Sequence, residues 1–125
     1  MKDKIFKFPA EEGEGTVGSP AGWTVIAGTP EARGWRYYTS DDGSALAGLW
    51  QCTPGTFNVV YDKWEFCHII SGACTITPEN RSPIKLGAGD GFLLEPGFKG
   101  RWEITETMRK HFVFKIDANA KTTTA

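Results

Sequence analysis

Apolar and polar residues alternate in short runs along most of the chain, and each run ends at glycine, proline or a group of polar turn residues. Alternation with a period of two indicates β-strands that bury one face. We predict strands over residues 22–28, 35–38, 45–52, 56–61, 64–71, 73–77, 84–86, 91–95, 101–106 and 109–116. Strands that recur about every 8–12 residues with turn signals between them are typical of a β-sandwich or barrel. No run keeps a helical period with caps at both ends, so we expect at most one helical turn, near Thr29–Ala32.

The length of 125 residues is that of one ordinary domain. We expect residues 1–21 to form an N-terminal arm with at most one edge strand. Residues 22–116 carry the alternating runs and are predicted to form the single β-domain. Residues 117–125 are small and polar, which predicts a flexible C-terminal tail.

Composition excludes several classes of partner. The formal net charge is −1, from 14 basic and 15 acidic residues, so no strong field of one sign attracts nucleic acid or an anionic membrane. The chain begins without a continuous apolar segment and has no run long enough to cross a bilayer, so we expect neither a signal peptide nor a membrane span. The three cysteines, Cys52, Cys67 and Cys74, show no CxxC spacing. This pattern argues against a disulfide framework or a zinc knuckle and favours a cytoplasmic location.

The run WEFCHIIS, residues 64–71, places an acid, a thiol and an imidazole within four positions. Side chains alternate across a strand, so Glu65, Cys67 and Ile69 share one face and His68 lies on the other. Cys67 and His68 are therefore not expected to bind the same metal ion.

Two segments resemble the two sequence motifs of the cupins. Gly55, TFNVVYDKWEFCHIIS and Gly72 resemble the first motif, and GDGFLLEPGFKGRW, residues 89–102, resembles the second. Within that superfamily the chain is similar to the small single-domain cupins grouped with the cupin domain of (S)-ureidoglycine aminohydrolase. The resemblance covers residues 22–116 and includes the runs GLWQCTPG and ETMRKHFV. It implies an all-β double-stranded β-helix, that is, a single jelly-roll barrel.

The resemblance also locates the positions that hold a metal in many cupins. A metal cupin has two histidines shortly before a glutamate, and a third histidine after the glycine of the second motif. Glu65 matches the glutamate. The histidine positions fall on Val59 and Tyr61, or with a longer spacing on Asn58 and Val60, and on Gly100. We therefore expect no cofactor. The alternative is a divalent transition metal bound by Glu65 and Cys67, with His111 as a third ligand.

If Glu65 points into the barrel, the same alternation identifies the other side chains of its cavity. Trp102 and Ile104 then point inward from the strand after Gly100. On the last strand Phe112 and Phe114 share an apolar face, with Lys110 at its mouth. The predicted ligand pocket, with Phe57 or Trp50 nearby, consists of Tyr61, Glu65, Cys67, Trp102 and Lys110.

Three functions are compatible with such a pocket. The first is binding of a small metabolite in an aromatic-lined barrel without the usual cupin metal. The second is a cofactor-free enzyme, an isomerase, lyase or hydrolase, in which Glu65 is the catalytic acid or base; the resemblance adds a metal-dependent aminohydrolase-like cupin as a variant. The third is a structural or regulatory subunit. We expect Cys67 to shape the pocket wall, because a neighbouring carboxylate disfavours a thiolate. The expected partners are a small molecule and a second copy of the chain, since small cupins often form homodimers.

Overall fold

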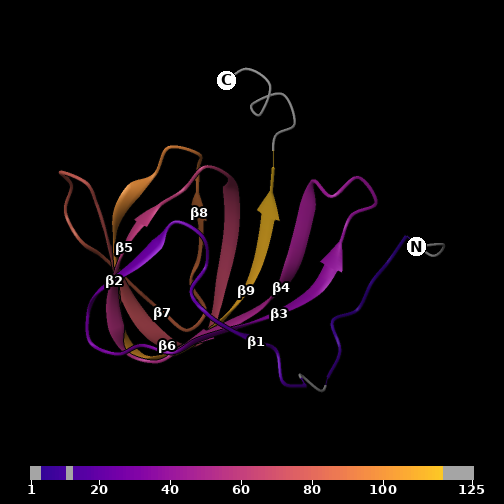
Figure 1. Ribbon diagram of the computed structural model, residues 1–125, viewed down its shortest axis with the longest axis horizontal. Coiled ribbons are helices and arrows are strands. Elements are labelled where there is room, and N and C mark those ends of the chain that lie inside the picture. Colours follow the sequence, from indigo (N-terminus) through magenta and orange to yellow (C-terminus); the bar gives the residue numbers. More distant parts are fainter. Residues whose placement is uncertain (1–3, 11–12, 117–125) are drawn as a thin grey trace.

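The computed structural model describes residues 4–10 and 13–116 (Figure 1). Its nine strands are β1 (Thr16–Val17), β2 (Trp23–Ala27), β3 (Ala32–Thr39), β4 (Ala45–Cys52), β5 (Gly55–Val60), β6 (Trp64–Pro78), β7 (Ile84–Gly87), β8 (Gly91–Leu94) and β9 (Lys99–Lys115). All pairings are antiparallel, and the described residues contain no helix. The predicted all-β jelly-roll fold is confirmed. Accordingly, no described segment meets the length and hydropathy that a membrane-crossing helix requires.

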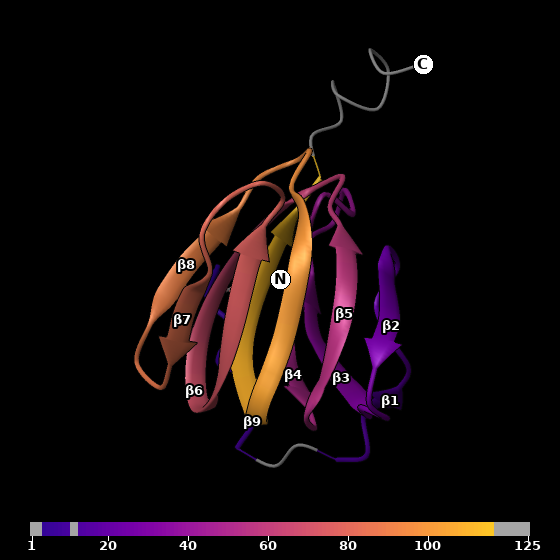
Figure 2. The same cartoon turned by 90° about the vertical axis from the view of Figure 1, so that its left-hand side faces the viewer.

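The long strand β9 organises the sheet. One edge of β9 pairs with β6 over residues 100–115. On the other edge, residues 99–104 pair with β5 and residues 108–115 pair with β4. The sheet therefore divides along β9 into one wing of β4, β3 and β1 and another of β5 and β2. Figure 2 shows β6 and β9 side by side, with β7 and β8 on one flank and β5 and β2 on the other. The result is a curled sheet that surrounds a hollow on its concave face.

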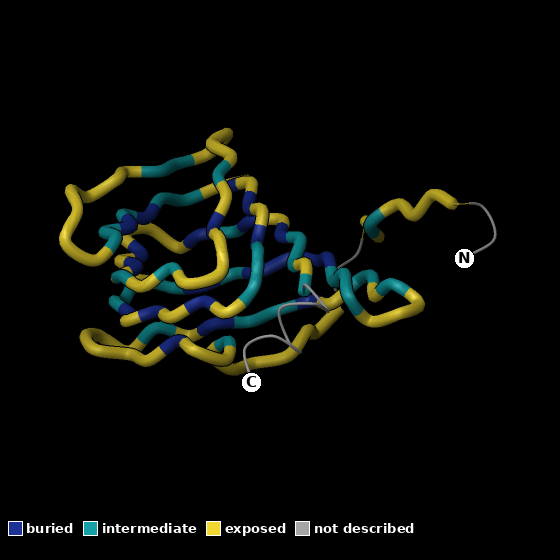
Figure 3. Tube along the Cα trace, turned by 90° about the horizontal axis from the view of Figure 1, so that it is seen from above, coloured by how far each residue is buried: buried dark blue, intermediate teal, exposed yellow. Residues whose placement is uncertain are grey.

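The core fills this hollow with alternate residues of each strand, as the buried and exposed segments in Figure 3 illustrate. On β6, Glu65, Cys67 and Ile69 are at most 1% exposed, whereas His68 is exposed. On β9, Trp102 and its inward neighbours are buried in the same way. The predicted orientation of both strands is thus confirmed.

Two predicted strand breaks do not occur. Residues 64–71 and 73–77 lie in the single strand β6, and residues 101–106 and 109–115 lie in the single strand β9. The register between β6 and β9 shifts around Gly72 instead of ending there. Gly72 has a φ of +84°, and a Cβ at this position would lie 2.1 Å from the carbonyl oxygen of Thr107. Glycine therefore forms a bulge that lets the strand continue, a role that sequence punctuation does not distinguish from a break.

No helical turn forms near Thr29–Ala32. Ala32 begins β3, and the preceding residue pairs with a distant segment. The N–H of Glu31 donates to Thr53 Oγ1 at 2.7 Å, and the N–H of Thr53 donates to the carbonyl of Glu31 at 3.1 Å. These long-range bonds use the groups that a helical turn would need.

The N-terminal arm contains one edge strand, β1, whereas residues 4–10 contain no strand. Instead, two phenylalanine rings lie on the outer face of the sheet. Phe6 contacts Tyr38, with ring centroids 5.9 Å apart, and Phe8 lies 5.1 Å from Tyr37 and 5.2 Å from His111. The first strand, β1, is only two residues long and pairs with β3. The predicted tail, 117–125, lies outside the described residues.

Candidate functional site

A pocket of about 500 Å³ opens on the concave side of the sheet, between the segment that precedes β2 and strands β3, β4 and β9. Its walls are mainly aromatic. The aromatic residues that line it are Trp23, Trp35, Trp50, Phe112 and Phe114, and the ionisable ones are Arg36, Tyr61, Glu65 and Lys110. The pocket therefore combines a large apolar surface with a few polar groups, which is the usual composition of a small-molecule site.

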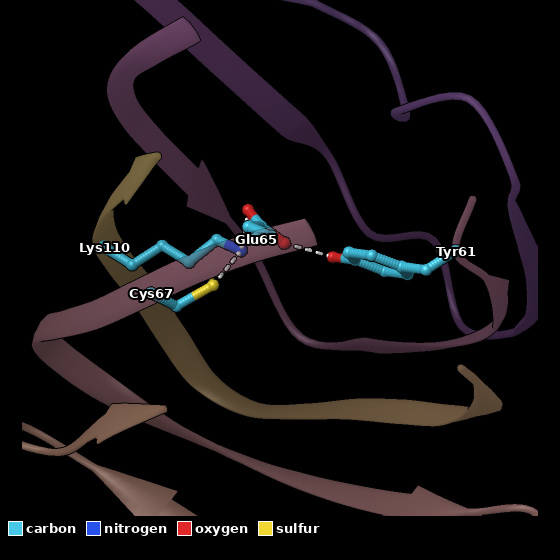
Figure 4. Close-up of polar contacts among 4 residues, drawn as sticks. All are labelled: Tyr61, Glu65, Cys67 and Lys110. Carbon is cyan, nitrogen blue, oxygen red and sulfur yellow. Dashed lines mark hydrogen bonds and ion pairs between the residues drawn. The ribbon is translucent and has the colours of Figure 1, made fainter. Parts of the chain in front are cut away.

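Glu65 is the centre of a buried polar cluster (Figure 4). The hydroxyl of Tyr61 donates to Glu65 Oε1, and Lys110 Nζ lies 3.1 Å from Glu65 Oε2. Lys110 Nζ also donates to Cys67 Sγ at 3.2 Å. Glu65 is 1% and Lys110 is 2% exposed, so both charges are removed from water. A pair buried this deeply needs close geometry and further hydrogen bonds to offset its desolvation, and the cluster supplies both.

The backbone positions the members of the cluster. Glu65 and Cys67 lie on the inward face of β6, and Lys110 reaches them from β9, where it is paired with Ile69. Tyr61 follows β5 and is held by the second motif: its N–H donates to the carbonyl of Phe98 at 2.9 Å, and its own carbonyl accepts from Gly97 at 2.8 Å. The two cupin-like motifs therefore meet at Tyr61.

Burial and neighbouring charges set the protonation states. Burial, and then the negative charge of Glu65, raises the pKa of Tyr61, so the phenol remains a proton donor. Burial likewise raises the pKa of the Cys67 thiol, which stays neutral at pH 7. Burial on its own lowers the pKa of Lys110, but its interactions with Cys67 and Glu65 outweigh burial, so the net shift is upward. Because the thiol is neutral, Glu65 is the partner that keeps Lys110 charged.

Indole rings surround the ammonium of Lys110. Nζ lies 4.7 Å from the ring centroid of Trp102, 4.9 Å from that of Trp50 and 6.0 Å from that of Trp23. Cation–π attraction adds to the ion pair, most strongly where water is excluded.

The structure brings all five residues of the predicted pocket together, but in two different positions. Tyr61, Glu65 and Lys110 line the pocket. Cys67 and Trp102 are fully buried and contact Lys110 from within the core. Of the two neighbours named from sequence, Trp50 lines the pocket and Phe57 is in the core.

Several lining residues were not predicted from the sequence, among them Trp23 and Arg36. Trp23 reaches the pocket because β2 pairs with β5, and Arg36 because β3 pairs with β4. Alternation from Ala32 would have placed Arg36 on the inward face of its strand. The pairing that brings β3 to the pocket, however, has no local signal.

The residues do not fit the metal site of a cupin. Val59 and Tyr61 are buried, whereas Asn58 and Val60 are exposed, so the shorter of the two spacings is the relevant one. Neither side chain is an imidazole. The third position, Gly100, pairs with Val59, and a Cβ there would lie 2.5 Å from the carbonyl oxygen of Thr77. A histidine therefore has no space at this position.

The alternative metal site, with His111 as third ligand, is not formed. His111 is exposed on the outer face of β9, where it contacts Phe8. Within the described part of the chain, no group of three or more His, Cys, Asp and Glu side chains is arranged to hold a metal ion. Lys110 places its own positive charge next to Glu65, where the family's metal would bind. The three cysteines are free and buried.

The fold and the position of Glu65 define this protein as a cupin. The family model of the EutQ-like cupin domain matches residues 39–112, more than half of the chain, and the chain belongs to this family. No functionally curated protein matches it in sequence.

Solved structures agree with this fold. The EutQ protein of Clostridium difficile is similar with a TM-score of 0.63 at 16% identity, over 70% of each chain. A putative ethanolamine utilization protein Q from Salmonella typhimurium has a TM-score of 0.58 at 18% identity, over 69% of this chain and 68% of its own. A protein of unknown function from Pseudomonas syringae pv. tomato has a TM-score of 0.67 at 20% identity, over 82% of this chain but 43% of its own. At these identities the likeness shows the fold alone.

Proposed function

We propose that this cupin binds a small organic molecule in its aromatic-walled pocket, and that it does so without a bound metal. The observation that carries the proposal is the buried Glu65–Lys110 pair at the inner end of that pocket. Replacing a buried ion pair by apolar side chains is often neutral or stabilising. A charged pair that lines a pocket is therefore better explained by a ligand than by the stability of the fold.

The dimensions and chemistry of the pocket support the same function. Its volume of about 500 Å³ is within the range of small-molecule sites. Trp23 and Trp50 offer flat surfaces for stacking. Tyr61, Glu65 and Lys110 offer fixed donors and acceptors that would orient a bound molecule.

Thermal melting against a panel of planar metabolites tests the binding function. A ligand should raise the Tm of the wild-type protein, and Tyr61→Phe, which removes one hydroxyl from the pocket, should reduce the rise. Glu103→Gln, on the exposed face of β9, is a matched control that should respond like the wild type. If no compound raises the Tm, or if the control and Tyr61→Phe weaken binding equally, the pocket is not the binding site.

Metal analysis of protein purified without chelator tests the second part of the proposal. We expect far less than one transition-metal ion per chain, and no rise in Tm on adding zinc, manganese or nickel. A stoichiometric ion that resists dialysis would contradict our account of the ligand positions.

Proton-transfer catalysis by Glu65 is a second candidate function. It is favoured by the hydrogen bond between Glu65 and Tyr61, whose raised pKa keeps a proton available inside the pocket. On a true substrate, Glu65→Gln should then abolish turnover while binding persists; normal turnover would exclude this role. The metal-dependent chemistry suggested by the likeness to (S)-ureidoglycine aminohydrolase has less support, because Val59, Tyr61 and Gly100 occupy the histidine positions.

We also propose that two copies of the chain associate through the outer face of β6 and β8. Phe66, Ile70 and Leu93 are 37%, 41% and 55% exposed on this part of the sheet. Sedimentation analysis should give the mass of a homodimer, and a monomer at micromolar concentration would contradict it.

A further inference from the structure

We propose that the ligand of this pocket is a planar organic anion, whose negative group is held by Arg36 at the mouth. This inference rests on the proposed binding function and identifies the chemical class of the ligand. Its first support is the position of Arg36, which lies on β3 opposite Gly48, lines the pocket and is exposed.

Arg36 has no partner within residues 4–10 and 13–116, in contrast to other arginines near it. The guanidinium of Arg33 donates to the backbone carbonyl of Glu14, and that of Arg109 donates to Gln51. No hydrogen bond or ion pair to a described residue is present for Arg36. A guanidinium at the mouth of a pocket can bind a carboxylate through two parallel hydrogen bonds.

The other polar groups of the pocket leave an excess of donors. Glu65 is the only carboxylate among the described lining residues, and its oxygens already accept bonds from Tyr61 and Lys110. Its charge is neutralised by Lys110, so the charge of Arg36 remains. The indole N–H of Trp50, in the wall of the pocket, is buried and has no acceptor among the described residues. This imbalance favours a ligand that carries acceptors and a negative charge.

The walls favour a flat body for that anion. Trp23 and Trp50 lie on one side, with ring centroids 5.3 Å apart, and Phe112 and Phe114 line another part of the wall, with centroids 5.1 Å apart. Such walls make more contact with a ring than with a flexible chain. An aromatic or heteroaromatic monocarboxylate satisfies both the walls and Arg36.

Calorimetric titration with matched acids and amides tests the inference. The probes are 4-hydroxybenzoate and 2-naphthoate, each compared with its neutral amide, at low ionic strength. We expect the wild-type protein to bind at least one acid about tenfold more tightly than its amide. Arg36→Gln should remove this preference. Arg101→Gln, an exposed arginine on β9, removes the same charge and should retain it.

The possible outcomes separate this inference from the binding function. If an amide binds as tightly as its acid, or if Arg36→Gln keeps the preference, the anion is excluded while binding in the pocket stands. If Arg101→Gln abolishes the preference as strongly as Arg36→Gln, long-range charge explains it, and Arg36 is not the contact. If neither acid nor amide binds, the inference fails. The metabolite panel and Tyr61→Phe then decide the binding function separately.

Discussion

The two ends of the β6–β9 ladder use the same alternation for different purposes. At one end, Cys74 pairs with Ile104 and Ile76 pairs with Trp102, and these inward side chains form an apolar core. At the other end, the charged side chains of Glu65 and Lys110 are buried as deeply as these apolar side chains. Burial of apolar side chains stabilises the fold, whereas burial of charge opposes it unless each charge is paired. The comparison indicates that one end provides stability and the other provides a site.

Removing one charge of the Glu65–Lys110 pair should cause the largest loss in the free energy of unfolding. Lys110→Met leaves Glu65 buried without its counter-ion, and we expect a loss of about 3–5 kcal/mol in the free energy of unfolding. Urea unfolding at pH 7 measures it. The double variant Lys110→Met with Glu65→Leu should recover most of the loss, since no unpaired charge remains. A double variant as unstable as the single one would show that the pair itself stabilises the fold.

A truncation in the apolar end should cause the next largest loss in the free energy of unfolding. Ile104 is 2% exposed, and Ile104→Ala should cost about 2–5 kcal/mol through lost burial and the cavity left behind. Ligand affinity should be unchanged, because Ile104 does not line the pocket. The same urea experiment, combined with a ligand titration, checks both statements. A large loss of affinity would mean that the two ends are not independent.

The hydroxyl of Tyr61 should contribute less. Tyr61→Phe removes one donor to a carboxylate that keeps Lys110, so we expect a loss of about 1.5–3 kcal/mol. Tyr38→Phe, away from the pocket, is the control for loss of a phenol. Equal losses from the two variants would remove the special role of Tyr61.

The buried thiols should have the smallest effect on stability. They change the free energy of unfolding only in alkali. Burial raises the pKa of Cys52 to about 12 and that of Cys74 to about 11, from 9.0. Above pH 9 the unfolded chain loses these protons first, so the free energy of unfolding should fall between pH 9 and about 11–12. Cys74→Val should make the fall shallower, as urea unfolding from pH 8 to 10.5 would show. An unchanged slope would mean that Cys74 does not contribute.

The sequence predicted those features of the site that depend on local alternation. Glu65, Cys67 and Trp102 point inward because side chains on a strand change face at every residue. The contribution of Arg36 could not be predicted, because it depends on which strands become neighbours. Gly72 looked like a stop because the same residue type ends strands and forms bulges. The position of the IFKF segment could not be predicted, because its rings contact residues far along the chain, on the outer face of the sheet.

The positive charge beside Glu65 belongs to a side chain of the protein. It is therefore present as soon as the chain folds, without a loading step, an insertion factor or competition between ions. Chelators and scarcity of trace elements cannot remove it. The charge can change only by mutation, by covalent modification of the amine or by deprotonation at high pH.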